Sequence, residues 1–424
     1  MTSLIQQQAS SLSQSIPRTL RLILLYIIIY AFGIGTFLGL LVFNHNPKNG
    51  KHSKSTFLQI WTVFVTVGIA IFYPYIIVRA YATNENILGI ETFTGAVAFI
   101  QMVINYLFIL LVYVIHFVKS GDLIKTLDDS EELAEELSEF ITEDTMKFHW
   151  EFIVHFLRKS VVVNLVALAA GIMYIRETNK MFNTVYGWET VFILVCPYCI
   201  QTFSANIFFL GFLRGKLYLQ IINHVVAKTV ERINGSNGKG HFKRLHQFTK
   251  ATNTLDVLSV GHFKICSIVR TINAIYGPQM LILVGSAFFN TMIQFFYLYI
   301  SMKINFHGGH LAHWSVSFYS VLYACFQFVD LYFHAMTSLE VRQESRRTGH
   351  LLHKLPSRHV DEHFKKTVDL FSIQIIQTKL EITLCRMFPL DITLIASSVS
   401  TIIEFLIILI QFDLTLNHPA NNMN

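Results

Sequence analysis

The last long apolar run of the chain carries polar side chains at helical spacing. On an α-helix that starts near Asp391, which follows a proline and is a suitable N-cap, one face collects Ser397, Ser400, Thr401, Glu404, Ile408 and Gln411. A carboxylate and an amide are costly in hydrocarbon, so this face must meet water or protein.

Two kinds of site fit this polar face. In an aqueous pathway, one Glu404 carboxylate per subunit would form an acidic ring that favours cations, and Ile408 would be an apolar collar that closes the pathway. In a sealed helix seam, Glu404 would be protonated or hydrogen-bonded to a neighbouring span. The residues alone leave both alternatives open.

The composition sets the class of protein. Of 424 residues, 53% are hydrophobic and 14% are charged, whereas soluble globular proteins carry about 25% charged residues. The 21 Gly and 8 Pro are too few for a fibrous protein, and the sequence has no short alternating strands of an outer-membrane barrel. We therefore predict an all-α, polytopic protein of the lipid bilayer, with its net charge of +6 in loops beside the membrane and no nucleic-acid partner.

Eight apolar runs are long enough to span a bilayer. They are residues 20–43, 57–79, 93–118, 152–175, 188–213, 276–301, 314–334 and 390–412. The first run has Arg18 and Arg21 before it and three Lys close after it, so both of its flanks favour the cytoplasm. We predict that it is a re-entrant or interfacial helix, leaving seven transmembrane helices with the N-terminus inside and the C-terminus outside. This orientation places all but four of the 33 Lys and Arg on the cytoplasmic side.

This topology divides the chain into five parts. Between the spans, the cytoplasmic loops have amphipathic helical patterns, with a break at NGSNGKG, and we expect them to continue the spans as long helices. The parts are a cytoplasmic N-terminus with the membrane-associated helix at 1–56, spans one to six with their loops at 57–337, a cytoplasmic helical anchor at 338–389, the last span at 390–412 and an extracellular tail at 413–424.

Motifs of enzymes and metal sites are missing or weak. The sequence has no Walker loop, dinucleotide fingerprint, nucleophile elbow or His-Glu-x-x-His, so we predict that the protein is not an enzyme and has no cofactor. His307, His310 and His313 lie in a predicted outer loop, and Cys196 and Cys199 lie inside a span. We interpret the histidines as solvated and the cysteines as packing residues, and we predict no metal site.

Short motifs near the C-terminus resemble those of the insect gustatory receptors. In that family the last span has Thr-Tyr, five apolar residues and Gln-Phe, and this chain has Glu404-Phe405, LIILI and Gln411-Phe412. FSIQIIQ at 371–377, FPLDITL at 388–394 and LGLLVFNHNPKNGK near the N-terminus also resemble family segments. A further family pattern, Glu-Ser, Thr and Leu-His, is matched by Glu344, Ser345, Thr348, Leu352 and His353.

Three positions depart from the family pattern. Glu404 stands where the family has Thr, Phe405 where it has Tyr, and Arg386 where many members have Gly. The clear matches cover about the last 80 residues and a short N-terminal piece, while the middle of the chain agrees only in architecture.

The resemblance implies a function that the motifs alone do not. It implies a chemosensory, ligand-gated, non-selective cation channel in the plasma membrane of chemosensory neurons, a homo- or hetero-tetramer with other gustatory receptor subunits, and a small organic tastant as ligand. The last span of each subunit would line the pore, with Gln411 at its outer narrow part and Ile408 as a hydrophobic gate. Two alternatives are a subunit of a heteromeric channel that binds no ligand itself and a seven-span G-protein-coupled receptor, although the chain has no Asp-Arg-Tyr after its third span.

The resemblance also implies that the ligand pocket lies among the outer halves of the earlier spans. Aromatic side chains that could enclose a small organic ligand there are Tyr174, Trp188, Phe192, Phe296, Tyr299, Trp314 and Phe318. Packing within the bundle or an interfacial aromatic belt would use the same residues.

Overall fold

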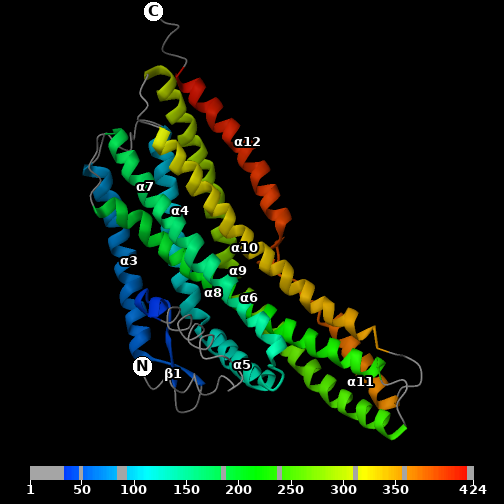
Figure 1. Cartoon of the computed structure of the whole chain (residues 1–424). Helices are drawn as coiled ribbons and strands as arrows, with labels where there is room; N and C mark the ends of the chain where they lie inside the picture. Colours follow the sequence, from blue (N-terminus) through cyan, green and yellow to red (C-terminus); the bar gives the residue numbers. More distant parts are fainter. Residues whose placement is uncertain are drawn as a thin grey trace, which may run out of the picture.

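The computed structural model describes residues 33–46, 51–83, 93–182, 188–235, 241–308, 314–355 and 361–417. In these ranges the protein is a bundle of long helices that lie side by side (Figure 1). The elements are β1 (Phe43–Asn46), β2 (Lys51–Lys54), α3 (Thr56–Thr83), α4 (Phe93–Val118), α5 (Ser120–Ser138), η1 (Glu143–Thr145), α6 (Met146–Leu157), η2 (Arg158–Val163), α7 (Asn164–Phe182), α8 (Trp188–Asn234), α9 (His241–Gly308), α10 (Trp314–Leu352), α11 (Glu362–Gln377), β3 (Thr383–Leu384), β4 (Phe388–Pro389) and α12 (Ile392–Asn417).

Six helical segments among the described residues are long and apolar enough to cross a membrane. They are Thr56–Arg79, Phe99–Val118, Glu143–Met173, Val195–Asn234, Phe242–Phe296 and Ile392–Thr415. Each contains or overlaps one predicted span. The predicted span at 314–334 forms the first part of α10 and is not among the six, and most of the predicted N-terminal membrane helix lies outside the described residues. The count of seven spans and their orientation stay predictions.

Three helices extend well beyond the length that a bilayer requires. About 20 residues span the hydrocarbon core, whereas α8, α9 and α10 have 47, 68 and 39 residues. The prediction that the spans continue as long helices is therefore confirmed for these three, whereas the acidic loop after α4 forms the separate helix α5. The predicted break at NGSNGKG is also confirmed in position, since α8 ends at Asn234 and α9 begins at His241.

The extensions pack into a core at one end of the bundle. There α5 buries Leu133 and Leu137, two residues of the predicted amphipathic pattern, against α9. In the same core, α11 buries Phe364 and Phe371, and it packs against α9 and α10. Burying a side chain of this size stabilises the fold by about 1.5–3 kcal/mol, so these four residues hold α5 and α11 to the long helices.

The all-α prediction omits two short antiparallel hairpins. In the first, Phe43 pairs with Lys54 and Asn46 with Lys51. In the second, only Thr383 with Pro389 and Leu384 with Phe388 are paired, and the turn contains Cys385 and Arg386 at φ values of 50° and 61°. Strands of two to four residues are too short to give an alternating pattern, which is why the sequence did not predict them.

The last helix lies along one side of the bundle, where it packs against α9 and α10 (Figure 1). Only 6% of its most apolar window is buried, compared with 56% for α8. Large apolar side chains such as Ile403, Ile407 and Phe412 are about half exposed. A single protomer thus leaves most of α12 uncovered.

Candidate functional site

The connection that leads into α12 is fixed to α9. Asn273 donates a hydrogen bond to the Thr383 carbonyl at 3.0 Å, and Arg270 donates to the Thr378 carbonyl at 2.7 Å. Asp391 then caps the helix, since its carboxylate accepts the Thr393 backbone N–H at 3.0 Å. The predicted N-cap is confirmed, and the start of α12 is held in place by side chains of α9.

The predicted polar face of α12 is uncovered. The exposed members are Ser397, Ser400, Glu404, Ile408 and Gln411, and Thr401 is half-buried. Among the described residues, the Glu404 carboxylate makes no hydrogen bond or ion pair. Within one protomer the geometry therefore provides no sealed seam for this carboxylate.

Two of the three hydroxyl groups on this face donate to the backbone of the helix itself. Ser397 donates to the Leu394 carbonyl at 3.0 Å, and Thr401 donates to the Ser397 carbonyl at 3.0 Å. Such bonds leave the hydroxyl oxygen as an acceptor for a further donor, such as water. The polar face can therefore be hydrated without loss of helical hydrogen bonds.

Other side chains of α12 hold the helix to its own protomer. Ile402 is buried, and the Phe405 ring lies 6.2 Å from the ring of Phe288 in an edge-to-face arrangement. Near the end of the helix, the Tyr299 hydroxyl donates to the Asp413 carboxylate at 3.2 Å. One face of α12 thus contacts α9, and the polar face is left for another partner.

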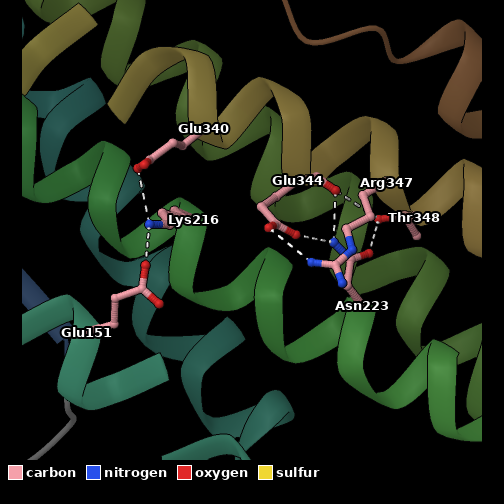
Figure 2. Close-up of polar contacts among 7 residues, drawn as sticks. All are labelled: Glu151, Lys216, Asn223, Glu340, Glu344, Arg347 and Thr348. Carbon is pink, nitrogen blue, oxygen red and sulfur yellow. Dashed lines mark hydrogen bonds and ion pairs between the residues drawn. The ribbon is translucent and has the colours of Figure 1, made fainter. Parts of the chain in front are cut away.

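A row of polar contacts joins α8 to α6 and α10 in the helix extensions. Figure 2 shows Lys216 of α8 between two carboxylates, Glu151 of α6 and Glu340 of α10, at 2.6 and 3.1 Å. The Lys216 side chain is only 6% exposed. A buried lysine between two carboxylates fixes the relative positions of three helices, because removing any one partner leaves a charge poorly compensated.

The same row continues farther along α8 and α10. Asn223 of α8 donates to the side chain of Glu344 at 2.7 Å and to its backbone carbonyl at 2.9 Å (Figure 2). Thr348 donates to the Asn223 side-chain oxygen at 2.7 Å, and Arg347 pairs with Glu344 at 3.3 Å. The Asn223 side-chain amide therefore donates through its nitrogen and accepts through its oxygen, and both bonds are made to α10.

A buried ionic cluster within the bundle was not predicted from the sequence. Lys159 pairs with Asp330 of α10 at 3.1 Å and donates to Asn206 of α8 at 2.7 Å. His334 lies 3.6 Å from Asp330, and the Lys159 ammonium lies 5.5 Å from the centre of the Phe209 ring. The side chains of Lys159 and His334 are fully buried. The signal that marks Glu404, a charge inside an apolar run, also marks Lys159 and Asp330 and could have found them.

The backbone at Lys159 is irregular. Residues Arg158–Val163 form a π-helical turn between α6 and α7. Such turns are rare and occur frequently at functional sites, because the extra residue turns side chains to directions that an α-helix does not offer. Here the turn carries the lysine that pairs with α10.

A small polar cavity adjoins this cluster. Its volume is about 20 Å³, which is room for about one water molecule. Its polar lining comes from α7, α8 and α10 and comprises Asn164, Tyr198, Gln201, Thr202, Gln327 and Asp330. None of the aromatic residues predicted to bind ligand belongs to this lining.

The predicted ligand residues are spread over several environments. Phe296 is fully buried with its ring 6.2 Å from that of Tyr299, whereas Phe318 is 62% exposed. Phe192 is half-buried beside the core that α3, α4 and α8 share. The side chains of Tyr174, Trp188 and Trp314 and those of the three outer-loop histidines lie outside the described part. Among the described members of this set, Phe296 and Tyr299 lie together, and the assignment stays a prediction.

Comparison with known proteins identifies the family. The family model described as 7tm chemosensory receptor matches residues 22–416. The chain belongs to this family.

Individual relatives place it among the insect gustatory receptors. Gustatory receptor 97a of Drosophila melanogaster is 22% identical over 395 residues, which are 90% of this chain and 88% of the relative. The gustatory receptor for bitter taste 66a of the same species is 25% identical over 174 residues, covering 41% of this chain and 33% of the relative. The solved structure of the insect olfactory receptor OR5 from Machilis hrabei has the same fold, with a TM-score of 0.58 at 15% identity over 91% of this chain and 99% of that one. The matched families are receptors rather than enzymes.

The geometry gives a physical meaning to the gustatory receptor motif after the sixth predicted span. Glu344 and Thr348 are the residues of α10 that hold Asn223 of α8. Ser345 contacts α9, where its hydroxyl lies 3.3 Å from His262 and 3.5 Å from the Cys266 thiol. The motif residues therefore lie where α8, α9 and α10 pack against one another.

The departures from the gustatory receptor pattern also acquire a structural context. Arg386 has a left-handed backbone conformation, which glycine adopts at no steric cost and which explains the preference for glycine there. Phe405 packs against α9 and Glu404 lies on the exposed face. Phe405 is itself 47% exposed, and of the two substitutions in the last-span motif Glu404 is the one that adds a charge to the uncovered surface.

Proposed function

We propose that this chemosensory receptor is a ligand-gated cation channel in which α12 lines the pore. Four copies would surround an axis, each with the polar face of α12 toward the centre. Glu404 would form the acidic ring that favours cations, Ile408 the apolar constriction and Gln411 the outer narrow part.

The observation that carries this proposal is the exposure of α12. A helix in lipid can leave an apolar face toward the hydrocarbon, but a face with an exposed carboxylate and amide needs water or protein. The protomer covers the side with Ile402, and the ring of Phe405 beside it contacts Phe288 of α9 while staying 47% exposed. A central aqueous pathway between copies provides water for the polar face, and neighbouring copies cover part of the apolar surface.

The ligand belongs to the same proposal. We infer a small organic tastant and a location in the plasma membrane of chemosensory neurons, supported by the similarity to the gustatory receptors. A heteromeric channel in which this chain binds no ligand itself is the alternative. Recording currents from the chain expressed alone and with other gustatory receptor subunits, against a panel of tastants, separates the two. The alternative is supported if the chain expressed by itself gives no current and co-expression with a partner subunit restores the currents.

Substitution of the carboxylate tests the pore. Glu404→Gln keeps the size of the side chain and removes its charge, so we expect a lower permeability to cations relative to anions. A matched control is Glu381→Gln, which removes an exposed carboxylate that pairs with Lys379 outside α12. Unaltered permeation in Glu404→Gln would remove this residue from the pore.

A further inference from the structure

The short hairpin formed by β3 and β4 presents an exposed cation directly before α12. The turn of this hairpin contains Cys385 and Arg386, both in the left-handed region with φ values of 50° and 61°. The Arg386 side chain is exposed, and among the described residues its guanidinium makes no hydrogen bond or ion pair. A positive charge therefore lies in solvent a few residues before the helix assigned to the pore.

The hairpin itself is firmly held, although its tip is exposed. Leu384 and Leu390, on either side of the turn, are 0% and 1% exposed. The Met387 backbone N–H donates to the Leu384 carbonyl at 2.9 Å. The turn also lies against Gly277 of α9, where an added Cβ atom would come within 3.6 Å of the backbone of the turn. The place of Arg386 in the protomer is thus fixed by buried neighbours.

The same helix, α9, covers one side of both the hairpin and α12. It holds the hairpin through Asn273 and contacts α12 through Phe288. The exposed tip of the hairpin and the exposed polar face of α12 are therefore both on sides that α9 leaves uncovered. In Figure 1 the chain enters α12 at its lower end, beside the long helices. If the polar faces surround an axis, the hairpin tips lie around one mouth of the pathway.

The carboxylates of the same connection have partners of their own. Glu381 pairs with Lys379 at 3.0 Å. Asp391 accepts hydrogen bonds from the Thr393 backbone N–H, at 3.0 Å, and from the Thr393 hydroxyl. Neither carboxylate is recorded in contact with Arg386. The arginine is thus the charged residue of this connection whose charge is not compensated among the described residues.

We propose that Arg386 is a second determinant of permeation, which forms a positive ring at the cytoplasmic mouth of the pathway that contains the Glu404 ring. This inference rests on the proposed function and on the predicted orientation of α12. A positive ring lowers the local concentration of cations. It hinders cations that enter from the cytoplasm more than cations that enter from outside. The channel should therefore pass inward cation current more readily than outward current.

Inside-out patches with equal Na⁺ on both sides test this asymmetry. The channel is opened by the tastant of the panel that gives the largest wild-type current, with the partner subunit if the chain needs one. The ratio of outward to inward current at equal and opposite voltages should rise at least about twofold in Arg386→Gln. Arg386→Lys keeps the charge and should behave as the wild type. The matched control is Arg346→Gln, which removes an exposed guanidinium from the extension of α10 and should leave the ratio unchanged.

Ionic strength gives a readout that a merely structural role of the arginine would not change. Charges are screened beyond about 8 Å in 0.15 M salt and beyond about 3 Å in 1 M salt. The difference in current ratio between the wild type and Arg386→Gln should therefore shrink as the NaCl concentration on the cytoplasmic side is raised. Labelling of the receptor at the cell surface shows whether each variant folds and reaches the membrane.

The inference is overturned if Arg386→Gln has the wild-type current ratio, or if Arg386→Lys changes the ratio as much as Arg386→Gln does. Glu404→Gln separates this failure from a failure of the proposed function. Altered cation permeability in Glu404→Gln together with an unchanged ratio in Arg386→Gln would remove Arg386 from the pathway and leave the pore in place. Unaltered permeation in both variants would remove the pore assignment itself.

Discussion

Removing one member of the pair formed by Lys159 and Asp330 should be among the most destabilising single substitutions in the bundle, because it leaves the other charge without a partner. Replacing Lys159 with Met removes an ammonium that pairs with Asp330 at 3.1 Å and donates to Asn206 at 2.7 Å. The methionine retains most of the apolar length of the lysine side chain. The main change is therefore the loss of the positive charge beside Asp330.

The expected cost follows from the burial of the pair. Lys159 is fully buried and the Asp330 side chain is 23% exposed, so the carboxylate that remains is poorly solvated. Breaking such a pair by removing one partner costs about 3–5 kcal/mol. That is a large share of the roughly 5–15 kcal/mol by which proteins are stable. The double variant Lys159→Met with Asp330→Asn has no unpaired charge and should recover about 2–3 kcal/mol of this loss.

Denaturant unfolding of the purified chain in mild detergent, followed by the fluorescence of its four Trp, measures these free energies. Wild type, the two single variants and the double variant together form a double-mutant cycle. A cost below about 1 kcal/mol for Lys159→Met, or single costs that simply add in the double variant, would refute the reasoning that this pair joins the π-helical turn to α10.

Two further predictions concern the contact between α8 and α10 and the turn before the last helix. Thr348→Val removes the donor to the buried Asn223 oxygen and should lower the free energy of unfolding by about 1–3 kcal/mol. Denaturant unfolding measures this change. An unchanged unfolding midpoint would contradict the prediction. Arg386→Gly relieves a left-handed backbone at φ 61° and should raise the free energy of unfolding by up to about 1 kcal/mol. Denaturant unfolding measures this change as well. A clear loss of stability would show that the arginine side chain makes a contact that outweighs the relief of backbone strain.

Helices and their ends were predictable because their signals are local. The apolar runs, the amphipathic pattern of α5 around Leu133 and the glycine-rich break before α9 each occupy a short stretch of sequence. The polar face of α12 was predictable for the same reason, since spacing along one helix decides which residues share a face.

Pairings between distant segments could not be predicted in this way. Lys159 and Asp330 lie on different helices, and a single sequence contains no information on which charged residue meets which. The same holds for His52, whose partners Asp128 and Glu131 are far along the chain in α5. The π-helical turn has no known local pattern in this sequence, and the two hairpins are too short to show alternation.

The most direct test of the pore is the accessibility of cysteines introduced along α12. Gln411→Cys and Ser400→Cys lie on the exposed polar face, whereas Ile402→Cys replaces a side chain that is buried against the protomer. In channels that open in response to a ligand, a water-soluble cationic thiol reagent should block currents through the first two variants and leave the third unchanged. The wild-type chain is the control for its native exposed Cys325 and Cys385. The assignment of this face to the pore would be contradicted if the reagent blocked the currents of all three variants equally. It would also be contradicted if the reagent did not block currents through Gln411→Cys and Ser400→Cys.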